Sequence, residues 1–98
     1  MRMKINSVGF SASSTLEEFI EKKLSKLEKY HDGILGMIVT LKLEKDDHLE
    51  NKVTEIQVEI KGSDVFARKN ARTFEETVDE LYDVLKRQLK KVKEKREE

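Results

Sequence analysis

GMIVTLKLEKDDHLENKVTEIQVEI, residues 36–60, contains two alternating apolar patterns joined by a polar segment. Aliphatic side chains recur at every second position in both halves: Met37, Val39, Leu41 and Leu43, then Ile56, Val58 and Ile60. This period of two is typical of β-strands that bury one face. The polar segment DDHLEN, residues 46–51, is typical of a hairpin loop. The stretch therefore predicts two neighbouring antiparallel strands.

Two further strands flank this hairpin. Gly62-Ser63-Asp64 predicts a tight turn, after which residues 65–72 (VFARKNAR) form a fourth strand. Residues 3–8 (MKINSV) alternate weakly and predict a first strand, which leads into the loop GFSAS.

A first amphipathic helix is predicted over residues 14–30. Ser14 and Glu17 have the spacing of a capping box, in which both side chains satisfy backbone amides at a helix start. Gly33 marks its end, because glycine tolerates the left-handed turn that often follows a helix. The apolar stripe consists of Leu16, Phe19, Ile20, Leu24 and Leu27.

A second, longer helix begins after a capping box formed by Thr73 and Glu76. The chain contains no proline, so this helix is able to continue for about five turns or more. Its apolar stripe consists of Phe74, Val78, Leu81, Leu85, Leu89 and Val92.

The predicted order is β-α-β-β-β-α, an α+β fold with a four-stranded sheet and both helices packed on one face. The first β-α-β unit should be a right-handed crossover between parallel strands, and the last three strands an antiparallel meander. Residues 1–98 are expected to form a single domain, with a tail at about residues 94–98 that frays.

The composition excludes several classes of protein. The chain has no cysteine, which excludes disulfides and thiol chemistry and fits a reducing cytoplasm. No apolar run approaches the roughly 18 residues that span a bilayer, and the N-terminal sequence MRMKINSVGF lacks the apolar stretch of a signal peptide. A cytoplasmic protein with no membrane partner is expected.

Charged residues make up 41% of the chain, yet its 20 basic and 20 acidic side chains give a net charge of zero. An electrostatic function therefore requires charges of one sign to be gathered on one surface. On the first helix, helical geometry places Lys22, Lys26 and Lys29 on one flank, and Lys23 nearer the apolar stripe.

The second helix is acidic in its first half and basic in its second, where seven basic residues fall within the eleven positions 86–96. This order complements the helix dipole, so a solvated helix face is the simple alternative to a binding surface. The fourth strand adds Arg68, Lys69 and Arg72, which have the alternative role of protecting a sheet edge from aggregation. If these three segments converge, the natural ligand is a phosphate backbone.

Catalytic and metal-binding motifs are missing. His31 and His48 have no cysteine or carboxylate set at ligand spacing, so no metal site, no cofactor and no small-molecule substrate are expected. No nucleophilic triad or phosphate-binding loop is present, which argues against an enzyme. Core packing is expected for Phe66 and partial burial for Tyr30 and Tyr82, in preference to stacking on bases.

Three segments in this order resemble the ribosome hibernation-promoting factor and ribosome-associated inhibitor A family. KKLSKLEKYHDGI (22–34) is similar to the first-helix signature of that family, VEIKGSDVFA (58–67) to a strand hairpin, and TFEETVDELYDVLKRQLKKVKEK (73–95) to the last helix. The resemblance covers nearly the whole chain. It implies a β-α-β-β-β-α domain that binds rRNA of the small ribosomal subunit near the decoding centre, overlaps the messenger and tRNA sites, and silences translation in stationary phase or under stress.

The resemblance also implies which residues bind rRNA. It adds ribosomal proteins as further candidate partners. The basic helix positions of the family match Lys22, Lys23, Lys26, Lys29, Lys86, Arg87, Lys90, Lys91 and Lys93. The predicted binding residues also include three cations of the fourth strand, which are added for their charge and not for a family match: Arg68, Lys69 and Arg72. The chain departs from the family pattern at His31, at Gly33 and in its zero net charge, and it resembles the short form of the family. The alternative function is a protein-binding adaptor whose acidic and basic flanks dock a complementary partner.

Overall fold

The computed structural model describes residues 1–44 and 50–97, and for residues 93–97 it describes the backbone alone. The elements follow the predicted order: β1 (Arg2–Val8), α1 (Ser14–Ser25), the 3₁₀ helix η1 (Lys26–Tyr30), β2 (Ile34–Leu43), β3 (Lys52–Ile60), β4 (Val65–Ala71) and α2 (Phe74–Glu97). The first predicted helix is thus continuous to Tyr30 but changes from α to 3₁₀ geometry for its last turn. Most of the predicted hairpin loop, including His48, lies outside the described residues.

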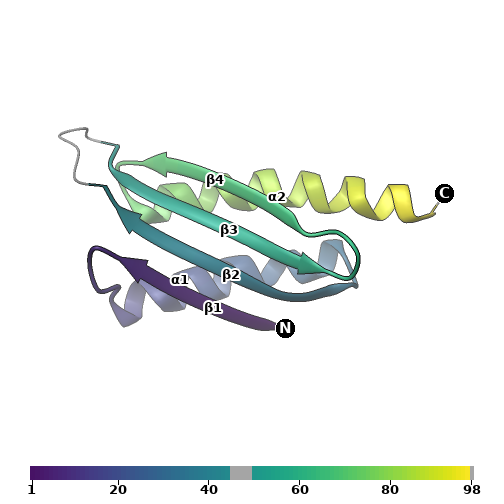
Figure 1. Cartoon of the computed structure of the whole chain (residues 1–98), viewed down its shortest axis with the longest axis horizontal. Coiled ribbons are helices and arrows are strands. Elements are labelled where there is room, and N and C mark those ends of the chain that lie inside the picture. Colours follow the sequence, from purple (N-terminus) through teal and green to yellow (C-terminus); the bar gives the residue numbers. More distant parts are fainter. Residues whose placement is uncertain (45–49, 98) are drawn as a thin grey trace.

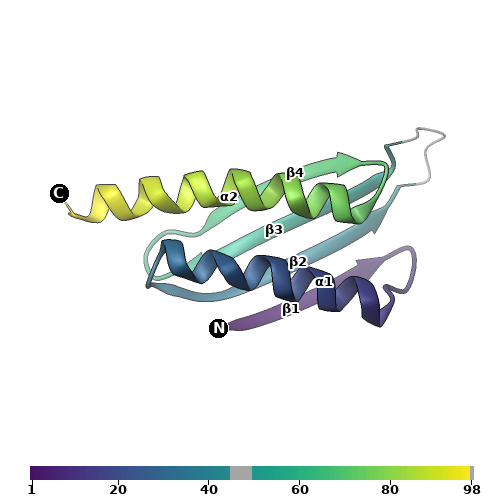
Figure 2. The same cartoon turned by 180° about the vertical axis from the view of Figure 1, so that it is seen from behind.

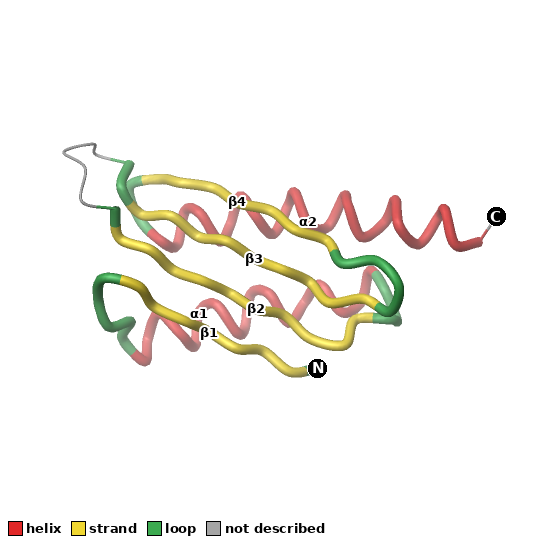
Figure 3. Tube along the Cα trace, viewed as in Figure 1, coloured by secondary structure: helices red, strands yellow, loops and turns green. Residues whose placement is uncertain are grey.

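The four strands lie side by side in the order β1-β2-β3-β4. β1 pairs with β2 in parallel, whereas β2 with β3 and β3 with β4 are antiparallel. Both helices cover the same face of the sheet and leave the other face open (Figures 1 and 2). The tube view in Figure 3 shows the two helices running along the strands behind the sheet. The predicted fold class, strand directions and placement of the helices are therefore confirmed.

The hydrophobic core lies between the sheet and the helices. Alternate residues of β2 and β3 contribute to it, as the period-two pattern predicts, and the helices contribute their apolar stripes. Fully buried members from the strands and both helices are Ile20, Leu24, Leu27, Val39, Leu41, Ile56, Val58, Val78, Leu81, Leu85 and Leu89. Val92, the last residue of the predicted stripe, is half-buried.

Phe66 does not join this core, so the expectation that it packs inside is wrong. Its side chain is 58% exposed. Val65 and Ala67 on either side of it are buried against the helices, and successive side chains of a strand point to opposite faces. Phe66 therefore lies on the open face of the sheet.

Hydroxyl side chains begin both helices. Thr73 Oγ1 accepts a hydrogen bond from the Glu76 amide at 3.1 Å, which confirms the predicted cap of α2. The cap of α1 is Ser13, one residue before the predicted Ser14, and Ser13 Oγ accepts from the Leu16 amide at 3.1 Å. The proposed box with Glu17 is therefore wrong, because residue three after the true cap is a leucine.

The end of η1 is closed by a side chain and not by a left-handed glycine. Among the described residues only Gly9 and Gly62 have positive φ, so the expected left-handed conformation of Gly33 is wrong. The Gly33 amide instead donates to Nδ1 of His31 at 2.8 Å. His31 is 5% exposed, and its Nε2 atom has no hydrogen-bond partner among the described residues. The ring thus packs into the end of the helix as a structural element.

None of the described helices combines the length and the apolar composition needed to cross a membrane.

Candidate nucleic-acid interface

The two helices run in the same direction along the sheet (Figure 2). This follows from the topology, since each helix returns antiparallel to the strand before it, and β1 and β4 have the same direction. The acidic first half of α2 therefore lies beside the start of α1, and its basic second half extends past η1. Charges that sum to zero over the chain are thereby sorted toward opposite ends of the helix layer.

Three lysines from two segments converge on the ring of Tyr30, the last residue of η1. The Nζ atoms of Lys29, Lys86 and Lys90 lie 5.3, 5.2 and 5.3 Å from the ring centroid. Lys86 and Lys90 are one turn apart on α2 and reach the ring from the neighbouring helix. Ammonium groups at this distance are attracted by the negative face of an aromatic ring. We call these four residues the Tyr30 cluster.

Tyr82 of α2 fixes the position of the Tyr30 ring. The two hydroxyl oxygens are 3.4 Å apart, and the ring centroids are 6.5 Å apart with an edge-to-face angle of 69°. The hydrogen bond with Tyr82 lowers the pKa of Tyr30, and desolvation partly opposes this. The charge of Lys29, and a hydrogen bond and the charge of Lys86, lower this pKa further. The hydrogen bond with Tyr30 raises the pKa of Tyr82, and its partial burial acts in the same direction. The lysines thus favour Tyr30 as the acceptor and Tyr82 as the donor.

Lys23 links the two helices beneath this cluster. Its Nζ atom lies 3.4 Å from Oδ1 of Asp79 and 4.7 Å from the Tyr82 ring centroid. It is half-buried, as expected from its position beside the apolar stripe. Because its charge already has a carboxylate partner, Lys23 contributes less to the net positive charge of this surface than its neighbours do.

The remaining predicted helix cations extend the surface on both sides. Lys22 of α1 and Lys26, the first residue of η1, are exposed beside Lys23, on the side of the helix that faces α2. The 3₁₀ geometry of η1 brings Lys26 and Lys29 into line, because side chains three residues apart eclipse in such a helix. Arg87 and Lys91 are exposed on the flank of α2 away from α1.

Among the side chains described in residues 1–44 and 50–92, Lys23 is the only one of these helix cations in an ion pair. The i,i+4 pairs that the sequence offers along α2, such as Asp83 with Arg87, are not formed between described side chains. The side chain of Lys93 lies outside the described part. The support that such pairs would give to a solvated helix face is therefore missing among the described side chains, whereas the match to the helix dipole remains.

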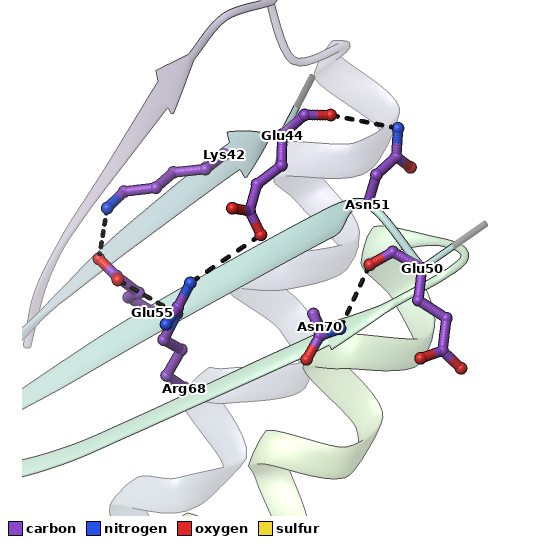
Figure 4. A network of polar contacts seen from close by, with 7 residues as sticks. All are labelled: Lys42, Glu44, Glu50, Asn51, Glu55, Arg68 and Asn70. Atoms are coloured by element: carbon purple, nitrogen blue, oxygen red, sulfur yellow. Dashed lines mark hydrogen bonds and ion pairs between the residues drawn. The ribbon is translucent and has the colours of Figure 1, made fainter. Parts of the chain in front are cut away.

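The structure does not bring the three cations of the fourth strand to this surface. Arg68 lies on the open face of the sheet, where its guanidinium group is 3.5 Å from Glu55 and 4.0 Å from Glu44 (Figure 4). Lys42 also pairs with Glu55, at 3.2 Å, so carboxylates on this face neutralise both Arg68 and Lys42. Lys69 and Arg72 are exposed at the end of β4 next to the acidic start of α2, and about 18 Å of helix separates that start from Lys86.

The aromatic centre of the site was not predicted. Tyr30 and Tyr82 are half-buried, as expected, but their mutual contact and the lysines over their rings join residues 52 positions apart. The sequence does contain one hint of this contact. Lysines stand at helical spacing before Tyr30 and after Tyr82, and both tyrosines lie on helices that pack against the same sheet. Because lysines occupy the Tyr30 ring, this ring is not free to stack on a base.

Comparisons with known proteins agree on one family. The model of the family described as Sigma 54 modulation protein / S30EA ribosomal protein matches residues 3–97. The ribosome hibernation promoting factor of Escherichia coli is 32% identical over 95 residues, which cover 97% of this chain and 96% of that relative. The protein of the same name from Pseudomonas putida is 33% identical over 97 residues, covering 99% and 91%.

A solved structure of a ribosomal subunit interface protein from Coxiella burnetii superimposes with a TM-score of 0.84 at 29% identity, covering 95% of this chain and 98% of that one. The family match spans nearly the whole chain, and the resemblance recognised in the three sequence segments is confirmed. This chain therefore belongs to the Sigma 54 modulation protein / S30EA ribosomal protein family.

Proposed function

We propose that this protein is a ribosome hibernation factor that silences translation by binding the rRNA of the small ribosomal subunit. The relatives named above support the biological role. The binding surface consists of the Tyr30 cluster together with Lys22, Lys26, Arg87 and Lys91, and with Lys93 by sequence. It lies near the decoding centre, where it blocks the messenger and tRNA sites, and ribosomal proteins make secondary contacts. The protein acts in the cytoplasm and catalyses no reaction.

The observation that carries this proposal is that lysines from two helices, which have no ion-pair partner among the described side chains, converge on one end of the helix layer. Lysines that gather without carboxylate partners create a local positive potential within the Debye length of about 8 Å, whatever the total charge. A phosphate backbone is the anion that matches a broad surface of this kind, because it presents negative charges at regular spacing.

The salt dependence of binding tests the electrostatic part of the proposal. If about six phosphates are neutralised, the logarithm of the affinity for small subunits should fall with the logarithm of salt with a slope of roughly −4 to −5. Sedimentation of the protein with purified small subunits across a salt series measures this slope. A flat response would contradict phosphate binding.

Charge reversal at matched positions tests the location. K86E/K90E should lose binding to small subunits, whereas R2E/K4E, which makes the same change in net charge, should retain it. Arg2 and Lys4 are exposed on β1 and lie on the open face of the sheet, because Met3 and Ile5 pack against the core. Circular dichroism of both variants checks that they fold. Equal binding by the two variants would refute the assignment of the surface.

The cellular role has its own test. In sucrose gradients of lysate from stationary cells, the protein should sediment with ribosomal fractions, and K86E/K90E should remain at the top of the gradient. A wild-type protein that remains at the top under the same conditions would contradict a ribosomal role and favour the adaptor alternative.

A further inference from the structure

The lysines of the Tyr30 cluster are held in an arrangement that costs electrostatic energy. Each of the three Nζ atoms lies within 5.3 Å of one point, the centroid of the Tyr30 ring. Like charges gathered around one ring repel one another, and flexible lysine stems in water are free to separate them. An attractive centre must therefore keep them together, and no carboxylate among the described residues pairs with any of the three.

The Tyr30 ring is that centre. The face of an aromatic ring carries partial negative charge and attracts ammonium groups with little need for desolvation. Unlike a carboxylate, the ring carries no net charge, so it gathers the lysines without cancelling their positive potential. The edge of Tyr82 and the hydroxyl contact at 3.4 Å hold the ring in place, and Lys23 joins Tyr82 to Asp79 at the base of the cluster.

From this geometry we infer that Tyr30 is a positioning residue, whose ring gathers Lys29, Lys86 and Lys90 into one subsite for a single phosphate group. A phosphate that binds there accepts hydrogen bonds from ammonium groups of both helices and relieves their mutual repulsion. This inference rests on the proposed function for the identity of the ligand as an RNA phosphate. The subsite itself is a property of the free protein.

Substitutions at residue 30 test the inference without any change in charge. Tyr30→Phe keeps the ring and its edge-to-face packing on Tyr82 and loses only the hydroxyl contacts, so its binding to small subunits should stay well above that of Tyr30→Leu. Tyr30→Leu keeps apolar bulk and loses the ring, so the three lysines disperse and affinity should fall by roughly ten-fold. The salt slope should also become shallower by about 0.7 to 0.9 for each phosphate contact that is lost.

A control separates positioning from stability. Phe66→Leu removes an exposed aromatic ring from the opposite face of the sheet and should leave affinity and salt slope unchanged. All variants are compared well below their melting temperatures, where each is fully folded. If Tyr30→Leu binds with the affinity and slope of the wild type, the lysines do not depend on the ring and the inference is overturned.

A second measurement does not involve ribosomes. Inorganic phosphate is titrated into the isotope-labelled protein, and the Nζ resonances of the lysines are followed by NMR. Lys29, Lys86 and Lys90 should shift together and more than Lys22 in the wild type and in Tyr30→Phe, and this preference should vanish in Tyr30→Leu. Uniform shifts in the wild type would refute the subsite. Preferential shifts without any binding to small subunits would refute the proposed function and leave the subsite standing.

Discussion

Replacing Thr77 by valine should destabilise the protein more than the same change at Thr54, although the two side chains form one hydrogen-bonded pair. Both residues are fully buried, and their Oγ1 atoms lie 2.6 Å apart between α2 and β3. Thr77 Oγ1 also donates to the carbonyl oxygen of Phe74 at 2.7 Å. A hydroxyl has a single hydrogen, so Thr77 must accept from Thr54.

The direction of this hydrogen bond determines how much stability each substitution costs. Valine at 77 removes the acceptor and leaves a buried hydroxyl hydrogen of Thr54 without a partner, which costs about 1–3 kcal/mol. Valine at 54 leaves the bond from Thr77 to Phe74 intact, so the cost should stay at or below about 1 kcal/mol. The double variant removes both hydroxyls and should be more stable than Thr77→Val alone, because apolar groups of the same shape replace both partners.

Urea unfolding of the wild type, the two single variants and the double variant, followed by circular dichroism, measures all four free energies of unfolding. For a domain of this size, each 1 kcal/mol corresponds to about 4–8 °C in Tm, so thermal scans should give the same order. A Thr54→Val variant as unstable as Thr77→Val, or a double variant whose loss equals the sum of the single losses, would refute the donor assignment.

Three further predictions concern other parts of the molecule. Ser13→Ala should lower the free energy of unfolding by about 1 kcal/mol through loss of the α1 cap, whereas Ser14→Ala should have little effect; urea unfolding distinguishes them. Gly36→Ala should destabilise by roughly 1–3 kcal/mol, because the added carbon would lie 2.9 Å from a backbone oxygen of β1, and hydrogen exchange should speed up most in β1. In an alkaline titration followed by ultraviolet absorbance, Tyr30 should ionise below the ordinary pKa of 10.0 and Tyr82 above it, and Tyr82→Phe should move the pKa of Tyr30 back up.

The sign of the effect of alkali on stability follows from these directions. The folded state favours ionised Tyr30, so its contribution to stability grows as the pH rises through its lowered pKa and is lost as the pH falls back through it. The folded state disfavours ionised Tyr82, so Tyr82 lowers the stability of the protein as the pH rises above its unfolded pKa. Measured tyrosine pKa values that coincide would contradict the asymmetry between the two rings.

The strands and helices were predictable from sequence because each follows a local rule. Alternation in residues 36–60 and the apolar stripe that begins at Phe74 depend on the period of the backbone alone. Errors arose where one residue decides the outcome. Ser13 and Ser14 both offer a capping hydroxyl, and adjacent Val65 and Phe66 are both apolar, so the pattern does not say which of the two faces the core.

The charged surface was predictable in its residues and less so in its geometry. Lysines at helical spacing gave the flanks of both helices, and the parallel directions of the helices follow from the strand order. The contacts of these side chains could not be predicted from the sequence, because Lys23 pairs with Asp79 and Tyr30 with Tyr82 across more than fifty residues. The pairing of Arg68 on the open face likewise depends on the strand register, which composition does not show.

The lengthwise sorting of charge in two parallel helices gives an electrically neutral molecule a charge separation along its 47 Å axis. A uniform electric field exerts no net force on a neutral molecule, but it exerts a torque on the molecule's dipole. A polyanion at a distance therefore orients the protein before it attracts the protein. The force then grows with the gradient of the field, which is steep only close to densely packed phosphates. Under the proposed function, sparse or heavily screened nucleic acid elsewhere in the cell should therefore hold this protein weakly, and the alignment of the molecule as it arrives should contribute to discrimination.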